Sequence, residues 1–244
     1  MTLLVPVLLS LVAGLATGLG GVFVALLRRL DMRTYDALLG FAAGVMTAIA
    51  SFGLLREATA HGKIPVVLIG VAMGAAALFA LDRCLPHEHL PVVAADRQAY
   101  RRGLLLFAAM TLHNVPEGLA VGTSFVAEPR LGLLLAVAIA LHNIPEGMAI
   151  AGPFRASGMP PRKYLAWALA SGMAEPIAAL LGAALVVTWA PLLPVCMAFA
   201  AGAMLYVVSD ELIPESHSHG FEHEATFGFL LGFLLVLGLT EALA

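Results

Sequence analysis

LHNVPEGLA (residues 112–120) and LHNIPEGMA (residues 141–149) are two near-copies of one polar motif, each placed inside an otherwise apolar segment. His113 and Glu117 in the first copy are four residues apart, as are His142 and Glu146 in the second. Residues at this spacing lie on one face of a helix, so each pair is expected to converge on a common point. The spacing therefore predicts two helices that each present an imidazole and a carboxylate.

Composition places these motifs in a membrane. Of the 244 residues, 61% are hydrophobic and 12% are charged, whereas roughly a quarter are charged in soluble domains. The net charge of -3 is spread thinly, which excludes the basic surface that nucleic-acid binding needs. Cys84 and Cys196 form no CxxC pair, so any bound metal would have nitrogen and oxygen ligands. The first apolar run lacks the basic start of a signal peptide and is read as a retained helix.

Eight apolar segments are long enough to cross a hydrocarbon core of roughly 30 Å as helices. We predict an all-α membrane protein with one domain over residues 1–244 and eight transmembrane helices. Their approximate spans are 3–27, 35–56, 64–82, 101–126, 131–152, 162–188, 191–213 and 224–243. The connection over about 83–100, with His87 and His89, is predicted to be a solvated cytoplasmic loop between helices three and four.

Basic residues give the orientation. Ten of the thirteen lysines and arginines fall at the first, third and fifth connections, and three fall at the second and fourth. By the positive-inside rule, both termini lie outside and the odd-numbered connections lie in the cytoplasm. Glycine pairs at four-residue spacing, such as Gly14/Gly18 and Gly228/Gly232, indicate close helix packing in lipid or, alternatively, sliding surfaces between moving helices.

Carboxylates near the middle of a span mark a functional site, because an ionised side chain at the bilayer centre costs several kcal/mol. Glu117, Glu146 and Glu175 are all placed there. Pro116 and Pro145 have no amide hydrogen and push against the preceding turn, which is expected to kink each motif helix and free a carbonyl. Imidazole and carboxylate ligands without thiolate suit Zn²⁺, Fe²⁺, Mn²⁺ or Co²⁺.

The asparagines extend the site. Asn114 and Asn143 point about 100° around the helix from their histidines, so they are candidates for a second, adjacent ion bridged by the glutamates. Glu175, which precedes Pro176 in the predicted sixth helix, is the candidate ligand from a third helix for that second position. The alternative is a buried polar network that only fixes helix packing. Two copies of the motif on consecutive antiparallel helices favour the metal site.

Two further groups of residues are candidates. Met46 in the second helix is either a thioether ligand or a core residue that fills a gap. A group of acidic and histidine side chains lies at the end of the seventh helix and beyond it. The group is either a cytoplasmic exit path for cations or a solvent-exposed helix end without such a role. Its members are Asp210, Glu211, Glu215, His217, His219 and His223.

At the paired motifs the sequence resembles the ZIP (Zrt/Irt-like) family of divalent metal transporters, and specifically its compact bacterial members. The resemblance covers the whole chain and implies a binuclear site at mid-membrane. Its first position is implied to comprise His113, Glu117, His142 and Glu146, and its second Asn114, Glu117, Asn143, Glu146 and Glu175. In the family a methionine at the place of Met46 can approach the first position.

The resemblance also implies function. It suggests uptake of Zn²⁺, and of Fe²⁺, Mn²⁺, Co²⁺ or Cd²⁺, into the cytosol, an elevator-like movement of the metal-carrying helices, a homodimer, and a multi-pass protein of the bacterial inner membrane. The ions are cargo, and no cofactor is expected. An intramembrane zinc-dependent hydrolase is the main alternative, but it would need an HExxH-like arrangement that the sequence lacks. A metal-binding membrane receptor without flux is the other alternative.

Overall fold

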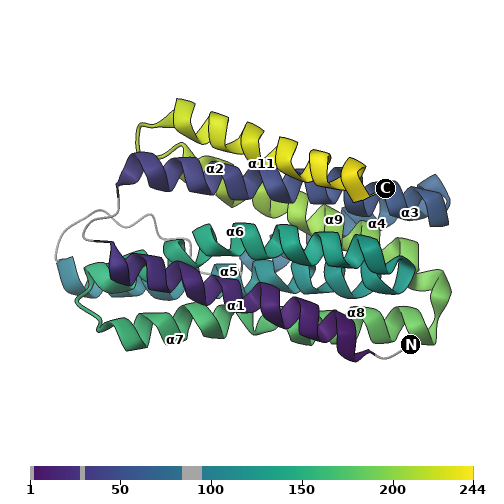
Figure 1. Cartoon of the computed structure of the whole chain (residues 1–244), viewed down its shortest axis with the longest axis horizontal. Helices are drawn as coiled ribbons and strands as arrows, with labels where there is room; N and C mark the ends of the chain where they lie inside the picture. The colour runs from purple at the N-terminus through teal and green to yellow at the C-terminus, as the bar shows by residue number, and fades with distance from the viewer. Residues whose placement is uncertain (1–2, 28–30, 84–94, 244) are drawn as a thin grey trace.

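The computed structural model describes residues 3–27, 31–83 and 95–243, which are helical apart from short connections (Figure 1). Within these residues, eight helical stretches are long and apolar enough to cross a membrane. They run over Leu4–Leu26, Met32–His61, Ile64–Asp82, Arg97–Ala127, Pro129–Ala156, Pro161–Thr188, Ala190–Ser216 and Glu222–Ala242. The predicted all-α membrane fold with eight spans is confirmed. Most of the predicted loop over about 83–100, including His87 and His89, lies outside the described residues.

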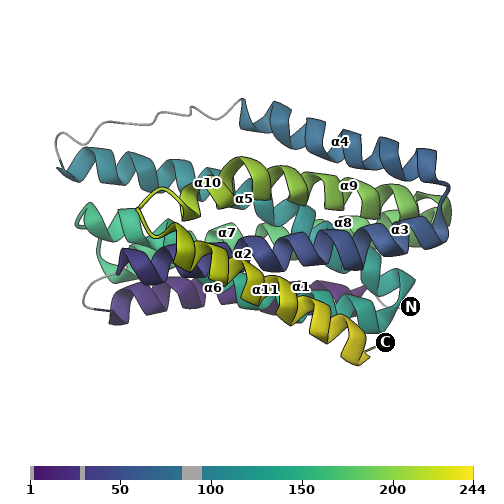
Figure 2. The same cartoon turned by 90° about the horizontal axis from the view of Figure 1, so that it is seen from above.

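Several spans are built from more than one helix. In chain order the elements are α1 (Leu4–Leu26), α2 (Met32–Ala48), η1 (Ile49–Leu55), α3 (Arg56–His61), α4 (Ile64–Asp82), α5 (Ala95–Ala127), α6 (Pro129–Ala156), α7 (Pro161–Gly172), α8 (Ala174–Thr188), η2 (Ala190–Leu192), α9 (Leu193–Val207), η3 (Val208–Leu212), α10 (Ile213–Ser216) and α11 (Glu222–Leu243). The start of α1 and the end of α11 lie at the same end of the molecule (Figures 1 and 2), as an even number of spans requires.

Three of the described spans contain a local departure from α-helix: the π-helical turns η1 and η3, and the break between α7 and α8. Proline explains the departure at η3 and at the break, but not at η1. The ring of Pro214 would press on the carbonyl of Asp210, four residues earlier, and the wider π-helical turn of η3 relieves that contact. Pro176 follows the break at Met173, which divides the sixth span into α7 and α8. No proline lies in the π-helical turn of η1. By contrast, α5 and α6 continue through Pro116 and Pro145.

The helices form two bundles. The motif bundle contains α1, α5, α6, α7 and α8, with α1 packed on α6 and α5 packed on both α6 and α8. The second bundle contains α2, α4, α9 and α11 with the short helices η1, α3, η3 and α10; α2 packs on α11, and α4 on α9. Figure 1 shows α2 and α11 of the second bundle above the motif bundle. The bundles meet mainly where α5 lies against α9 and α2 against α6.

Glycine allows the closest helix approaches, and these occur inside the bundles. A Cβ at Gly14 would collide with the backbone of Gly172, and one at Gly44 would collide with the backbone of Phe229. Among the nearest contacts of the glycines within residues 3–27, 31–83 and 95–243, only that of Gly53 reaches the other bundle, and this neighbour is a leucine side chain rather than backbone. The glycine pairs seen in the sequence therefore serve helix packing within each bundle.

Candidate metal centre

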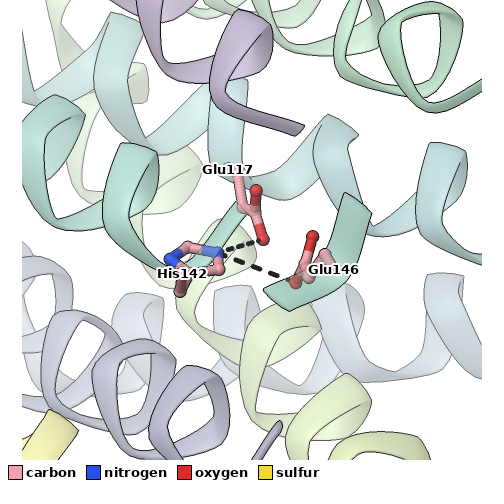
Figure 3. A group of neighbouring side chains, drawn as sticks. All are labelled: Glu117, His142 and Glu146. Atoms are coloured by element: carbon pink, nitrogen blue, oxygen red, sulfur yellow. Dashed lines mark hydrogen bonds and ion pairs between the residues drawn. The ribbon is translucent and has the colours of Figure 1, made fainter. Parts of the chain in front are cut away.

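Glu117, His142 and Glu146 form a buried cluster at the centre of the motif bundle (Figure 3). Nε2 of His142 lies 3.0 Å from Oε1 of Glu117 and 3.8 Å from Oε1 of Glu146. One potential ligand atom from each side chain lies within 4.8 Å of the other two, and all three side chains are fully buried. In the described part of the chain, this is the only group of three or more His, Cys, Asp and Glu residues with such spacing.

The local sequence explains why the two motifs meet. α5 ends at Ala127 and α6 begins at Pro129, so one residue connects two antiparallel helices. Gly132 fits against the backbone of Phe125 just beyond this turn, which allows the two helices to run close together. The motifs lie at similar distances from the turn, and the carboxylate of the first therefore reaches the imidazole of the second.

The glycine of each motif allows a neighbouring helix to pack closely, whereas the polar residues of the motif form the cluster. A Cβ at Gly118 would collide with the backbone carbonyl of Glu175 in α8, and one at Gly147 would collide with that of Thr17 in α1. These contacts press α8 and α1 against the motif helices at the level of the cluster. The motif thus carries both the polar groups and the contacts that enclose them.

Polar atoms without partners gather around the cluster. Seven buried atoms of the motif residues and Glu175 lack a hydrogen-bond partner: Nδ1 of His113, Oδ1 of Asn114 and Asn143, Oε2 of Glu117 and Glu175, and both carboxylate oxygens of Glu146. Six of these seven are oxygen acceptors. Leaving a buried acceptor without a partner costs about 1–3 kcal/mol, and carboxylates cost more. A cation bound at the cluster would satisfy the free carboxylate oxygens of Glu117 and Glu146, so the residues of the cluster fit a metal ion.

Asn143 and Glu175, two of the residues predicted for a second position, contact each other. Nδ2 of Asn143 donates to Oε1 of Glu175 at 2.6 Å and to the main-chain carbonyl of Ala13 at 2.8 Å. Glu175 lies in the first turn of α8, directly after the break at Met173, where the positive end of the helix dipole favours a carboxylate. Asn114, also predicted for the second position, is fully buried and donates to Oγ of Ser171 at 3.2 Å.

His113 has a different neighbour from the other motif histidine. Its Nε2 lies 3.2 Å from Oε1 of Glu211, which belongs to η3 in the second bundle. His113 is 2% exposed, and a small cavity lined in part by Asp82 and Tyr206 lies beside the pair. The His113–Glu211 pair therefore connects the two bundles next to the cluster. Met46 is fully buried in α2, the helix of the second bundle that packs on α6.

The predicted exit-path residues do not form one group. Besides Glu211, Glu215 forms an ion pair with Arg102 of α5 at 2.8 Å. His219 contacts the buried carboxylate of Asp36 at 2.8 Å. The remaining members, Asp210, His217 and His223, lie on the second bundle, where Asp210 and His223 are exposed and Nε2 of His217 lies 3.4 Å from the hydroxyl of Thr226.

Two polar partners of the motif residues were not identified from sequence. Ser171 lies in α7, and the break at Met173 separates it from Glu175 in α8; a single serine in an apolar span is a weak signal. The carbonyl of Ala13 belongs to an apolar segment, and a backbone atom leaves no signal in the residue type. Only the packing of α1 and α7 on the motif helices brings these two groups to the site.

Comparison with known proteins supports the resemblance seen in the motifs. The family described as ZIP Zinc transporter matches residues 87–240. The chain is 41% identical to the zinc transporter GufA of Myxococcus xanthus, over 96% of this chain and 97% of that protein. It is 41% identical to the zinc transporter ZIPB of Bordetella bronchiseptica, over 93% and 78%, and 36% identical to the zinc transporter ZupT of Corynebacterium glutamicum, over 93% and 95%. With its eight spans, this multi-pass cell-membrane protein belongs to the ZIP zinc transporter family.

Proposed function

We propose that this protein takes up divalent transition-metal ions, Zn²⁺ first among them, into the cytosol through the buried cluster of the motif bundle. The observation that carries the proposal is the group Glu117, His142 and Glu146, fully buried and surrounded by acceptor oxygens without partners. Membership of a family of zinc transporters supports it. The names of the three relatives above point to the same ion.

The cluster can replace the water molecules that coordinate a cation in solution. A dication that leaves water loses strong ion–dipole interactions, and a low-dielectric core makes that loss expensive. Two carboxylates and an imidazole replace those interactions at the depth where they are most needed. Because the donors are nitrogen and oxygen, the expected ions are Zn²⁺ and also Fe²⁺, Mn²⁺, Co²⁺ and Cd²⁺.

Two adjacent ion positions are proposed. The first comprises His113, Glu117, His142 and Glu146, with the thioether of Met46 as a further ligand. The second comprises Asn114, Glu117, Asn143, Glu146 and Glu175. In this proposal Glu117 and Glu146 are ligands of both positions. Their free oxygens support it, because Oε2 of Glu117 and both oxygens of Glu146 have no hydrogen-bond partner among the described residues. For the first position, His113 must turn from Glu211 toward the cluster.

Uptake through this site is tested by cellular metal content. Cells that express the wild type should accumulate Zn²⁺ from medium that contains Zn, Fe, Mn, Co and Cd, whereas cells with Glu146→Ala at the same membrane level should not. The exposed glutamate Glu222 provides the matched control, because Glu222→Ala removes the same group far from the cluster. Mass spectrometry of washed cells ranks the ions. Equal metal in wild type and Glu146→Ala cells would contradict uptake through the cluster.

Movement of one bundle against the other is proposed as the transport step. In the part of the chain that the structure describes, the close backbone contacts of glycine lie within bundles, and the one close glycine contact across the boundary involves a side chain. Side chains can exchange neighbours in small steps, whereas interlocked backbones cannot. An elevator-like displacement of the motif bundle would carry the cluster between the two membrane faces. Release is proposed to begin at Glu211, which already contacts His113, and to continue past the other predicted exit-path residues, Asp210, Glu215, His217, His219 and His223.

A covalent link between the bundles tests this movement. Arg102 and Glu215 pair across the boundary at 2.8 Å, whereas Arg33 and Glu224 pair within the second bundle at 2.7 Å. In a chain whose native cysteines are replaced by serine, Arg102→Cys/Glu215→Cys joined by a reducible thiol cross-linker should lose uptake and regain it on reduction. The joined Arg33→Cys/Glu224→Cys variant should keep uptake. Unchanged uptake in the first variant, with cross-linking complete, would rule out a displacement at this boundary.

The remaining features of the proposal follow from the sequence. Both termini are proposed to lie outside. The connections between spans five and six and between spans seven and eight are proposed to lie in the cytoplasm. The functional unit is proposed to be a homodimer in a bacterial inner membrane. No catalytic activity is proposed. The ions are transported rather than retained, and the hydrolase and receptor alternatives both predict no flux in the uptake experiment.

A further inference from the structure

Ser171 connects Asn114 to a chain of hydroxyl groups. It lies in the last turn of α7 and is fully buried. Its Oγ lies 3.2 Å from Nδ2 of Asn114 and 3.2 Å from Oγ1 of Thr111, both on α5. Oγ1 of Thr111 in turn lies 2.6 Å from the carbonyl of Phe107. The next residue after Ser171 is Gly172, whose backbone lies against that of Gly14, so the position of Ser171 is fixed by a backbone contact.

The number of hydroxyl protons determines which group donates and which accepts in this series of hydrogen bonds. Thr111 has one hydroxyl proton, and its shortest contact, to the carbonyl of Phe107, uses that proton. The proton of Ser171 therefore points to Oγ1 of Thr111, which leaves a lone pair of Ser171 to accept from Asn114. Turning the amide of Asn114 over would require Ser171 to donate to it instead, which breaks the contact with Thr111 or the one with Phe107.

The direction matters because only one end of an amide binds a cation. With Nδ2 held by Ser171, Oδ1 of Asn114 is left buried without a partner. In the opposite orientation the amide would present N–H groups, which repel a metal ion. Asn143 is held in the same sense, since its Nδ2 donates to Ala13 and Glu175 and its Oδ1 is also left free. Both asparagines thus have their nitrogen anchored and their oxygen available.

We propose that Ser171 is a positioning residue that holds the amide of Asn114 with its oxygen available to the second ion position. This inference rests on the proposed transport function and adds a determinant of ion selectivity. An amide oxygen is a hard ligand, so its loss should weaken binding of Zn²⁺ more than that of the softer Cd²⁺. Residues that orient a ligand typically contribute about 10- to 100-fold to metal affinity or activity.

Uptake kinetics of Ser171→Ala test the proposal. We expect the apparent KM for Zn²⁺ to rise about tenfold, with a smaller rise for Cd²⁺, so the ratio of Zn²⁺ to Cd²⁺ uptake falls. Ser171→Thr keeps the hydroxyl and should restore the ratio. Thr111→Val keeps the shape of the side chain and removes the acceptor of the Ser171 proton; it should shift the ratio in the same direction. Ser124→Ala is the matched control, because Ser124 is an equally buried serine whose hydroxyl has no partner.

The ratio of Zn²⁺ to Cd²⁺ uptake in Ser171→Ala decides whether Ser171 has the positioning role. An unchanged ratio in Ser171→Ala, or an equal loss for both ions, overturns the positioning role, since damage to the fold lowers both together. If the wild type itself moves no metal, the transport function fails, and the role of Ser171 is then decided by Zn²⁺ and Cd²⁺ dissociation constants of purified protein in detergent. A selective loss of Zn²⁺ affinity in Ser171→Ala would support the positioning role, and an absence of metal binding by the wild type would overturn it.

Discussion

Glu117→Gln is expected to reduce metal uptake to that of cells lacking the protein, while the variant inserts and folds normally. The substitution keeps the size of the side chain and removes its charge. Oε1 of Glu117 contacts His142 at 3.0 Å, and Oε2 has no hydrogen-bond partner among the described residues; we propose that this carboxylate serves both ion positions. Its loss should therefore impair both at once. Uptake is measured as cell-associated Zn²⁺ at matched protein levels, as in the Glu146→Ala experiment.

Stability separates this effect from misfolding. The amide oxygen introduced by Glu117→Gln can still accept from Nε2 of His142, so the variant keeps this buried contact and should unfold in detergent close to the temperature of the wild type. The exposed Glu222→Gln should alter neither uptake nor stability. A correctly inserted Glu117→Gln variant that still accumulates Zn²⁺ would show that the two positions do not share this carboxylate.

Gly147→Ala is expected to destabilise the motif bundle strongly. The added Cβ would meet the carbonyl of Thr17 and the Cα of Gly20, which are backbone atoms that no side-chain rotation can move away. Overpacking of this kind costs about 1–3 kcal/mol or more, and here it would separate α1 from α6. We expect a clear loss of monodisperse protein after heating, measured by size-exclusion chromatography in detergent across a temperature series.

The same helix provides the control for Gly147. Gly152 also lies in α6, but a Cβ there would meet nothing within 4 Å. Gly152→Ala should therefore leave the protein as stable as the wild type, or slightly more stable because alanine has the higher helix propensity. Equal heat resistance of the two variants would mean that α1 and α6 can separate without cost. It would also remove the packing role assigned to the motif glycine.

The sequence was sufficient to predict the eight spans, because each requires a long apolar run and the runs are well separated. It also placed Glu117, His142 and Glu146 together, since helical spacing within each motif and a short connection between them leave few alternatives. Pro176, which accompanies the helix break next to Glu175, is likewise visible in the sequence, although the sixth span was predicted as one helix. These features depend on local spacing, which a sequence shows directly.

Contacts between distant segments were harder to predict. The pairing of His113 with Glu211 depends on where α9 and η3 lie against α5, and no repeat or spacing in the sequence indicates this. The hydroxyl chain through Ser171 likewise depends on how α7 approaches α5. Division into two bundles depends on which glycine meets which backbone, and glycine spacing alone is the same in both bundles.

The contact between Gly14 and Gly172 limits how these two positions can vary among descendants of this protein. Each would collide with backbone of the other if it gained a Cβ, so neither has a side chain that could be shortened to admit a larger neighbour. Gly18 is different, because it faces the side chain of Leu169, and a smaller residue there could accept a substitution at Gly18. Compensating pairs of substitutions are thus open to Gly18 and Leu169, whereas Gly14 and Gly172 can change only if two helices move apart.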